Sequence, residues 1–222
     1  MLDIFDILGP IMVGPSSSHT AGAVRIGNMA RALLGAEPKT AEILLHGSFA
    51  ETGRGHGTDR ALVAGLLGMK PDDLRIPRSF ELARAQGLEF HFQNVELKEA
   101  HPNTAALSVT GQGGQTVTLQ AASTGGGRIR VDRLDGIDVS FTGAFNTLII
   151  HSRDVPGKLA EVTRELEQGG VNIANMNLCR AKRGGDVLMV IETDQKIPPV
   201  ARTLIAELQD VAQVTYYERE DG

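Results

Sequence analysis

The sequence predicts an α+β protein with two domains, residues 1–145 and 146–222. In the first region, helix-like apolar runs are followed by short alternating stretches that are typical of strands, which together predict an α/β sandwich. In the second region the order is strand, helix, strand, strand, helix, strand, the βαββαβ plan of a ferredoxin-like fold. A chain of 222 residues is long enough for two domains of this size.

The first helix of the N-terminal region is predicted over residues 21–34. Its apolar residues recur at helical spacing, and Gly35 provides a stop. The segment before it, GPSSSHT, is rich in glycine, proline and serine and is interpreted as a turn. The stretch AEILLHGSF, which begins at Ala41, then predicts a strand.

A second glycine-rich passage separates this strand from the next helix. Three glycines within residues 53–57 predict a turn, and the apolar run over 58–67 predicts a helix. Thr58 or Asp59 is the expected N-cap, because both side chains accept hydrogen bonds from unpaired backbone N–H groups. This arrangement places His56 at the entrance of the helix.

The chain from Leu88 to Phe141 predicts antiparallel strands joined by hairpins. Apolar and polar residues alternate there in short stretches, which are separated by turn residues. The GQGG at residues 111–114 is the strongest hairpin signal. The expected strands are LEFHF, ALSVT, QTVTLQ, RIRVD and IDVSF.

The C-terminal region has the clearest pattern of the chain. NTLIIHSR predicts a strand, and DVPGKLAEVTRELEQGG predicts a helix. Asp154 is expected at or near the cap of this helix, with Pro156 in its first turn and Gly169 at its end. Two strands around a KRGG turn, a second helix and a final strand complete the region.

The composition and the charge exclude several classes of function. Hydrophobic residues make up 41% and charged residues 22%, which is ordinary for a globular protein. The net charge of −5 argues against a nucleic-acid partner, because binding the phosphate backbone generally requires a basic surface. No stretch has the length of a membrane span, and the N-terminal MLDIFDILGP lacks the features of a secretory signal. We therefore expect a cytoplasmic protein with no membrane partner.

Cys179 is the only cysteine of the chain. It forms no disulfide within the chain, which fits a reducing compartment, and one thiolate does not hold an iron–sulfur cluster in the usual way. The six histidines show no short metal-ligand spacing, so no metal site is expected in this chain. His46, His91 and His151 lie in strand-like stretches and are interpreted as structural.

The GPSSSHT passage predicts a site for a small anion. Ser16, Ser17, Ser18 and Thr20 offer hydroxyl and backbone N–H groups next to a helix, whose first turn adds unpaired donors and partial positive charge. The expected ligand is a carboxylate or a phosphate. The alternative is an ordinary serine-rich helix cap. The passage lacks the Gly-Lys-Ser/Thr ending of a P-loop, and the chain has no G-x-S-x-G nucleophile elbow.

His19 and His56 are the candidate catalytic residues. Histidine titrates near neutral pH, so a histidine beside a helix entrance is suited to removing a proton from a bound substrate. The alternative is that each ring bonds a carbonyl group and shapes a turn. Asn103, in HPNT, either binds the amino or carboxylate group of a substrate or forms a turn.

The C-terminal region resembles the ACT domain, the small amino-acid-sensing module of metabolic enzymes. The resemblance rests on DVPGKLAEV, from Asp154, and on GVNI, from Gly170. It implies that Asp154, Gly157 and Asn172 lie near a regulatory ligand, and that the loop 155–159 is a possible site for a monovalent cation. It also implies a homodimer contact through this region. The alternative is that the domain binds no ligand and serves only as the dimer contact.

The whole chain is similar to the β subunits of bacterial iron–sulfur L-serine dehydratases. GPSSSHT, HGSFAETGRGHGTDRAL, HPNT and the ACT-like region occur in the order of that family. The resemblance implies conversion of L-serine to pyruvate and ammonia, with a [4Fe–4S] cluster held by the cysteines of a separate α subunit. It implies catalytic roles for His56, His19 and Thr58; the alternative for Thr58 is a helix cap. The residues on the substrate side would be Ser16, Ser17, Ser18, Thr20 and Asn103.

A second function remains open at this point. The chain could instead be a regulatory subunit without catalytic residues, in which the GPSSSHT pocket senses serine. The residues do not decide between these two functions, between L-serine and L-threonine as substrate, or between possible numbers of α and β chains.

Overall fold

The computed structural model describes residues 11–180 and 182–219. The N-terminal MLDIFDILGP, on which the prediction about a secretory signal depends, lies outside these residues. The chain divides into two compact units, Met1–Gly136 and Ile137–Gly222. The predicted domain boundary, after residue 145, falls at the start of a strand that begins at Asn146.

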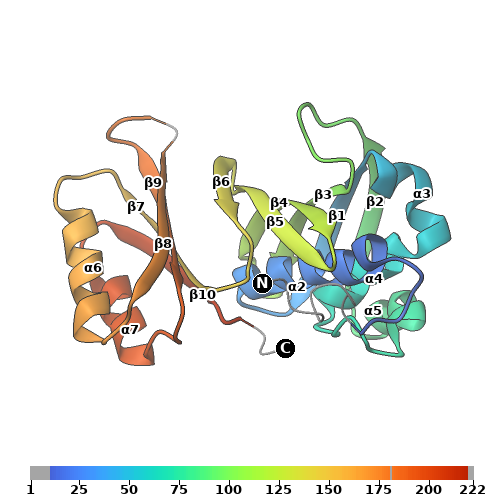
Figure 1. Ribbon diagram of the computed structural model, residues 1–222, viewed down its shortest axis with the longest axis horizontal. Coiled ribbons are helices and arrows are strands. Elements are labelled where there is room, and N and C mark those ends of the chain that lie inside the picture. Colours follow the sequence, from blue (N-terminus) through green and yellow to red (C-terminus); the bar gives the residue numbers. More distant parts are fainter. Residues whose placement is uncertain (1–10, 181, 220–222) are drawn as a thin grey trace, which may run out of the picture. The chain divides into compact units, whose positions relative to one another are not determined.

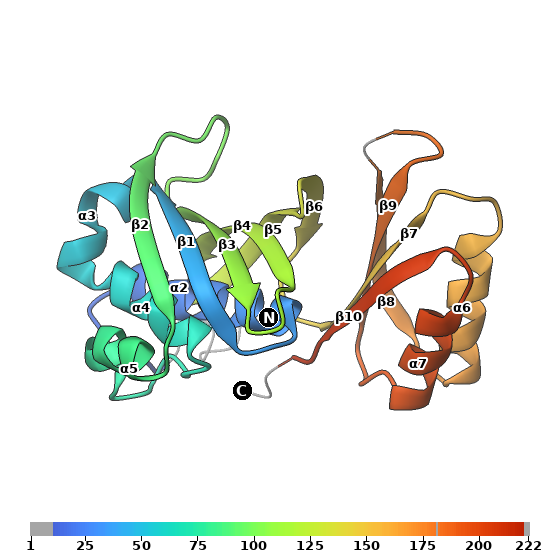
Figure 2. The same cartoon turned by 180° about the vertical axis from the view of Figure 1, so that it is seen from behind.

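The N-terminal part is built on a six-stranded sheet with helices on one face (Figures 1 and 2). The strand order is β2-β1-β3-β4-β5-β6. Figure 2 shows the strands in front and helices α2 and α4 behind them. The elements are η1 (Ser17–Gly22), α2 (Ala23–Leu34), β1 (Pro38–His46), α3 (Ser48–His56), α4 (Thr58–Leu66), η2 (Ile76–Arg78), α5 (Ser79–Ala85), β2 (Glu89–Val95), β3 (Thr104–Gly111), β4 (Thr116–Gly125), β5 (Arg128–Leu134) and β6 (Ile137–Phe141).

The pairing of β1 corrects one prediction. The stretch LEFHF was expected in an antiparallel hairpin, but its strand, β2, runs parallel to β1, with Ile43 opposite Phe92. The reason is that α3, α4 and α5 lie between these two strands, and a crossover of this length joins parallel neighbours. On its other side β1 is antiparallel to β3, and the GQGG turn joins β3 to β4 in the predicted hairpin.

Two glycines hold the helical layer together. A Cβ atom at Gly65 of α4 would lie 2.1 Å from the carbonyl oxygen of Val24, and one at Gly27 of α2 would lie 2.3 Å from that of Leu62. The backbones of α2 and α4 therefore cross in direct contact, which only glycine at both positions allows. Since η1 leads into α2 and α4 begins at Thr58, this crossing sets the distance between the two predicted site segments.

The helix α3 was not predicted. The glycines of residues 53–57 were expected to form a turn, but α3 continues through Gly53 and Gly55 and ends at His56. Helix-interior glycine costs about 1 kcal/mol relative to alanine, so tertiary packing must support the helix, and the side chain of Phe49, the second residue of α3, is fully buried. Gly57, with φ of 74°, ends α3 and is also the N-cap of α4, so the cap is neither Thr58 nor Asp59. His56 therefore lies at the end of one helix, directly before the next.

From β7 onward, the C-terminal unit has the predicted βαββαβ order (Figure 1). Its antiparallel sheet has the order β10-β7-β9-β8, and both helices lie on one face. Leu148, Ile150, Val162, Leu166 and Met189 are among the residues of the core between them. The elements are β7 (Asn146–Arg153), α6 (Lys158–Gln168), β8 (Ile173–Arg180), β9 (Asp186–Thr193), α7 (Pro199–Glu207) and β10 (Val211–Tyr217).

Candidate functional site

The segment expected to be a turn at GPSSSHT is a π-helical turn, η1, that runs directly into α2. Ser16 is its N-cap, and the Ser16 hydroxyl oxygen accepts a hydrogen bond of 3.3 Å from the backbone N–H of His19. The imidazole of His19 turns inward, and the residue is only 8% exposed. π-Helical turns interrupt regular helices and are frequent at functional sites.

Helix α3 brings two hydroxyl groups to the same imidazole. Ser48 Oγ and Thr52 Oγ1 each lie 3.1 Å from His19 Nε2. Thr52 also donates a hydrogen bond of 2.8 Å to the carbonyl oxygen of Ser48. On the other side of the ring, Ser16 Oγ lies 3.3 Å from Nδ1, so both ring nitrogens of His19 have hydroxyl partners.

Gly47 fixes the start of α3. Its φ of 53° and ψ of −126° suit glycine, and a Cβ atom there would lie 2.7 Å from the carbonyl oxygen of Pro102. The HPNT loop thus packs against the residue that precedes Ser48. Asn103 takes part in this loop through its backbone, with its N–H donating to His101 Nδ1 at 3.1 Å and its carbonyl accepting from Ser123 N–H at 2.9 Å.

The structure brings the two candidate histidines together. The ring centroids of His19 and His56 lie 4.9 Å apart, with an angle of 69° between the ring planes. His56 is exposed, whereas His19 is buried. Phe49, the second residue of α3, contacts the ring of His19 edge-on, at 5.3 Å between centroids. The pair therefore consists of an inner histidine that is held by hydroxyl groups and an outer one that is open to solvent.

Burial lowers the pKa of His19 below its usual 6.5, and the charge of His56 lowers this pKa further, while a hydrogen bond to the backbone of Ser48 opposes both effects. His19 is therefore neutral at neutral pH. A neutral imidazole that lies beside hydroxyl groups is able to accept a proton.

Two further predicted site residues, Thr20 and Thr58, are buried. Thr20 is 2% exposed and Thr58 is fully buried, and neither hydroxyl has a hydrogen-bond partner among the described residues. The Thr20 hydroxyl is covered by Gly14, where a Cβ atom would lie 2.2 Å from it. Ser17 and Ser18 are half-buried in the first turn of η1, where backbone N–H groups lack partners within the helix.

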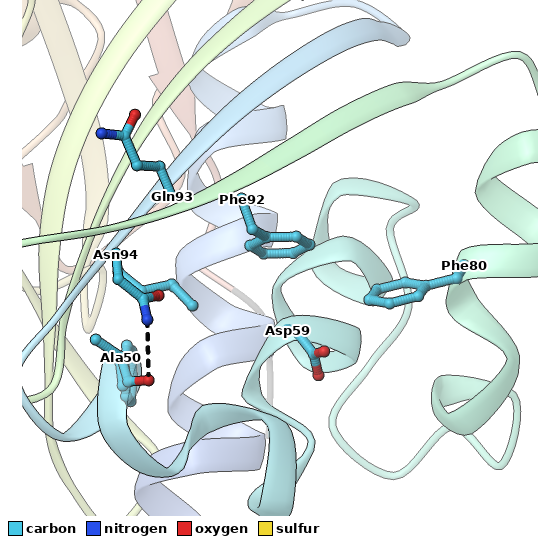
Figure 3. A pocket seen from close by; sticks show the side chains of 8 residues that line it. Ala50, Asp59, Phe80, Phe92, Gln93 and Asn94 are labelled. Atoms are coloured by element: carbon cyan, nitrogen blue, oxygen red, sulfur yellow. Dashed lines mark hydrogen bonds between the residues drawn. The ribbon is translucent and has the colours of Figure 1, made fainter.

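A cavity of about 600 Å³ lies beside α3, on the side of β2 and α5 (Figure 3). The side chains of Asp59, Phe80, Phe92 and Asn94 surround it in the close-up view. None of the predicted site residues lines this cavity. Phe49 is the link between the two places, because it lines the cavity and also contacts His19.

Comparison with known proteins identifies the family. The family model described as "Serine dehydratase beta chain" matches residues 1–85, and the one described as "ACT domain" matches residues 146–210. The probable L-serine dehydratase beta chain of Bacillus subtilis (strain 168) is 39% identical over 212 residues, which are 96% of this chain and 96% of that protein. The chain belongs to the serine dehydratase beta chain family.

Two further relatives agree with this membership. The L-serine dehydratase beta chain of Peptoniphilus asaccharolyticus is 37% identical over 96% of this chain and 97% of that protein. L-serine dehydratase TdcG of Escherichia coli (strain K12) is 40% identical over 95 residues, which are 39% of this chain and 21% of that protein. The predictions of the serine dehydratase beta chain family, of the α+β fold class and of the ACT domain are confirmed.

Among the residues that the structure describes, this member of the serine dehydratase beta chain family has no group of side chains that could ligate a metal cluster. Across residues 11–180 and 182–219, no three His, Cys, Asp or Glu side chains gather in a way that could hold a metal ion. Cys179 is a free thiol in the ACT domain, and burial raises its pKa, with the charge of Asp138 adding to the effect. These residues do not fit an iron–sulfur cluster. In the same described part of the chain, no helix is both long and apolar enough to cross a membrane.

The predicted ligand residues of the ACT domain flank α6, with Asp154 and Gly157 before it and Asn172 after it. Asp154 does not cap α6, because the helix begins at Lys158 with Gly157 as its N-cap. The Asp154 carboxylate instead accepts hydrogen bonds from Arg180 and from Gly184 N–H at 2.8 and 2.9 Å, in the turn between β8 and β9. Asn172 follows the other end of α6. An 11-residue helix is roughly 16 Å long, so Asp154 and Asn172 belong to segments at opposite ends of α6.

Sequence reasoning missed Ser48, Thr52 and Phe49. Ser48 and Thr52 stand four residues apart, the spacing that puts two side chains on one face of a helix, and His56 continues that spacing. This signal could be used only if residues 48–56 were interpreted as a helix, whereas the glycines indicated a turn.

Proposed function

We propose that this chain is the β subunit of an L-serine dehydratase and that it completes the active site together with a separate α chain. In the proposed reaction, L-serine loses the proton of Cα and the hydroxyl group of Cβ, giving aminoacrylate and water. Aminoacrylate becomes an imine, and water then hydrolyses the imine to pyruvate and ammonia. The role assigned to this chain is to bind the serine carboxylate and to handle the proton.

The observation that carries the proposal is the pair of His19 and His56. His19 is neutral because of its burial, its ring is held through both nitrogens, and His56 opens the pair to solvent. Such a pair suits removal of a proton next to a carboxylate. His56, the exposed ring, would contact the substrate from the solvent side, while the inner His19 would take up the proton.

The serine-rich turn would hold the substrate carboxylate. Ser17 and Ser18 lie in the first turn of η1, and the unpaired N–H groups and partial positive charge of a helix start favour an anion there. The further residues proposed for this site are Thr20, Thr58 and Asn103. The unpartnered hydroxyl groups of Thr20 and Thr58 are in keeping with roles that are completed only when substrate and the second chain are bound.

The iron–sulfur cluster is proposed to belong to the α chain, because the donor set of this chain does not fit one. The ACT domain is proposed to pair with a second copy and to bind a regulatory amino acid across the pair, for which Asp154, Gly157 and Asn172 remain the candidate residues. A monovalent cation on the loop 155–159 belongs to the same proposal. The single free thiol is in keeping with a cytoplasmic enzyme.

The alternative function is an amino-acid-sensing subunit without a catalytic role, which the ACT domain favours. One experiment separates the two functions. Pyruvate formation from L-serine is measured anaerobically for this chain alone, for its α chain alone and for the mixture, after cluster reconstitution. We expect turnover only in the mixture. Full turnover by the α chain alone would overturn the catalytic proposal and would favour the sensing function.

A further inference from the structure

We propose that Thr52 is a positioning residue that holds His19 in the tautomer with its proton on Nε2, so that Nδ1 is the nitrogen of this site that accepts a proton. The catalytic meaning of this proposal rests on the proposed function, whereas the tautomer itself does not. Neither Thr52 nor Ser48 was singled out by the sequence.

The assignment follows from the hydrogen count of Thr52. A threonine hydroxyl has one hydrogen, and Thr52 donates it to the carbonyl oxygen of Ser48 at 2.8 Å. Thr52 Oγ1 can then only accept at its second contact, 3.1 Å from His19 Nε2. The hydrogen in that contact must come from the ring, so Nε2 carries it. With the opposite tautomer, the Ser48 hydroxyl, also 3.1 Å from Nε2, could donate to this nitrogen, but a lone pair of Thr52 Oγ1 would still face the unprotonated Nε2 at 3.1 Å unless Thr52 gave up its bond to the Ser48 carbonyl oxygen.

The surroundings of Nδ1 agree with this tautomer. Ser16 Oγ already accepts a hydrogen bond from the backbone N–H of His19, so its own hydrogen is available for Nδ1 at 3.3 Å. Nδ1 of a ring that is protonated on Nε2 is the acceptor which this hydrogen needs. Both ends of the imidazole are then satisfied, and Nδ1 faces the serine-rich turn at which the substrate carboxylate is proposed to bind.

The same contacts serve the charged ring after proton transfer. When the Cα–H bond of the substrate breaks, its proton joins Nδ1 and its electron pair forms the Cα–Cβ double bond. The hydroxyl group leaves with its own electron pair and takes up a proton from solvent to become water. The Ser16 hydroxyl then rotates and accepts from Nδ1–H, while Thr52 goes on accepting from Nε2–H. An imidazolium needs two acceptors, and these two hydroxyl oxygens supply them.

The tautomer is measured directly on the full-length chain. Long-range ¹H–¹⁵N correlation spectra of uniformly labelled protein, recorded where His19 is neutral, distinguish a protonated from an unprotonated ring nitrogen. We expect Nε2 of His19 to be protonated in the wild type and in Thr52→Ser, and a mixture of tautomers in Thr52→Val. A wild-type ring with its proton on Nδ1, or a Thr52→Val spectrum identical to the wild type, would overturn the proposal.

A matched control separates the lost acceptor from a lost helix contact. Thr163 in α6 donates to the carbonyl oxygen of Leu159 at 2.9 Å, the same bond to the preceding turn that Thr52 makes, but in the other unit. Thr163→Val is therefore expected to leave the His19 spectrum unchanged. If it alters this spectrum as Thr52→Val does, the effect is not that of a positioning residue.

The catalytic part is tested in the mixture with the α chain. Thr52→Val is expected to lower kcat by about 10- to 100-fold with little change in KM, because a misplaced general base loses part of its contribution to the rate. Thr52→Ser, which keeps the hydroxyl group, is expected to retain most of the wild-type kcat. Unchanged kcat in Thr52→Val, together with the altered spectrum, would refute the assignment of Nδ1 as the reacting nitrogen. An inactive wild-type mixture would count against the proposed function, and the spectra would still decide the tautomer.

Discussion

Substituting Gly65 by alanine tests the helix crossing that supports the site. The new Cβ atom would lie 2.1 Å from the carbonyl oxygen of Val24 and 2.8 Å from both Asn28 N and Gly27 Cα. An ordinary carbon–oxygen contact is about 3.3 Å, so α2 and α4 would have to move apart by about 1 Å. All of these neighbours are backbone atoms, which cannot turn away as a flexible side chain could.

The expected cost follows from these distances. Overpacking typically lowers the free energy of unfolding by about 1–3 kcal/mol, and a contact as short as this one belongs at the upper end of that range. The higher helix propensity of alanine restores roughly 1 kcal/mol. The net loss in the free energy of unfolding is therefore about 2 kcal/mol, which lowers Tm by roughly 4–8 °C in a chain of this size. Thermal unfolding followed by circular dichroism measures the shift.

Gly55→Ala is the matched control for this substitution. Gly55 also lies within a helix, but no atom lies within 4 Å of the position that a Cβ atom would take. Alanine there is expected to leave Tm unchanged or to raise it, by at most about 1 kcal/mol of added stability. A Gly65→Ala variant as stable as the wild type would refute the conclusion that the two helix backbones are in direct contact.

Three further predictions concern the titration of His19 and the ACT domain. Because the pKa of His19 is lowered in the folded chain, the unfolded state binds a proton at this histidine first as pH falls below 6.5. The free energy of unfolding should therefore decline from pH 6.5 until the pKa of the folded state is reached. His19→Gln should flatten this decline, as measured by urea unfolding at a series of pH values. His56→Gln removes the second cause of that lowered pKa and leaves burial, the larger one, in place, so an NMR titration should show a higher pKa for His19; an unchanged pKa would argue against electrostatic coupling of the rings. Asp154→Asn weakens the acceptor of Gly184 N–H, so this amide should exchange its hydrogen faster than in the wild type, and an equal rate would argue against the contact.

Much of the fold could be predicted because the local patterns agree with the tertiary structure. In the ACT domain, alternating strands, an amphipathic helix and the KRGG turn lie where the sequence predicts them. The parallel pairing of β2 could not be predicted from the strand itself, because LEFHF alternates in the same way in either direction. The direction is set by the helices between β1 and β2, one of which, α3, was interpreted as a turn.

The site could be predicted only in part, for the same reason. His19 and His56 stand in motifs rich in glycine and hydroxyl residues, and these motifs drew attention to both. Ser48 and Thr52 lie in the same passage as His56, but their four-residue spacing is a signal only if residues 48–56 form a helix. They reach His19 because Gly47 lets α3 start against Pro102. Asp154 is a residue type that often caps helices. Its carboxylate instead accepts hydrogen bonds from Arg180, at the end of β8, and from the backbone N–H of Gly184 in the β8–β9 turn.

The two histidines of this chain, His19 and His56, are proposed to carry out the proton transfer of serine dehydration. The most direct test is kcat of the mixture with the α chain for wild type, His19→Gln and His56→Gln, with cluster absorbance and the affinity between the chains measured on the same samples. We expect kcat to fall by at least about 100-fold in both variants, while cluster absorbance and the affinity between the chains stay at wild-type values. A kcat within about twofold of wild type in both variants would contradict the catalytic role of the two histidines, because loss of a group that transfers the proton must lower kcat by far more.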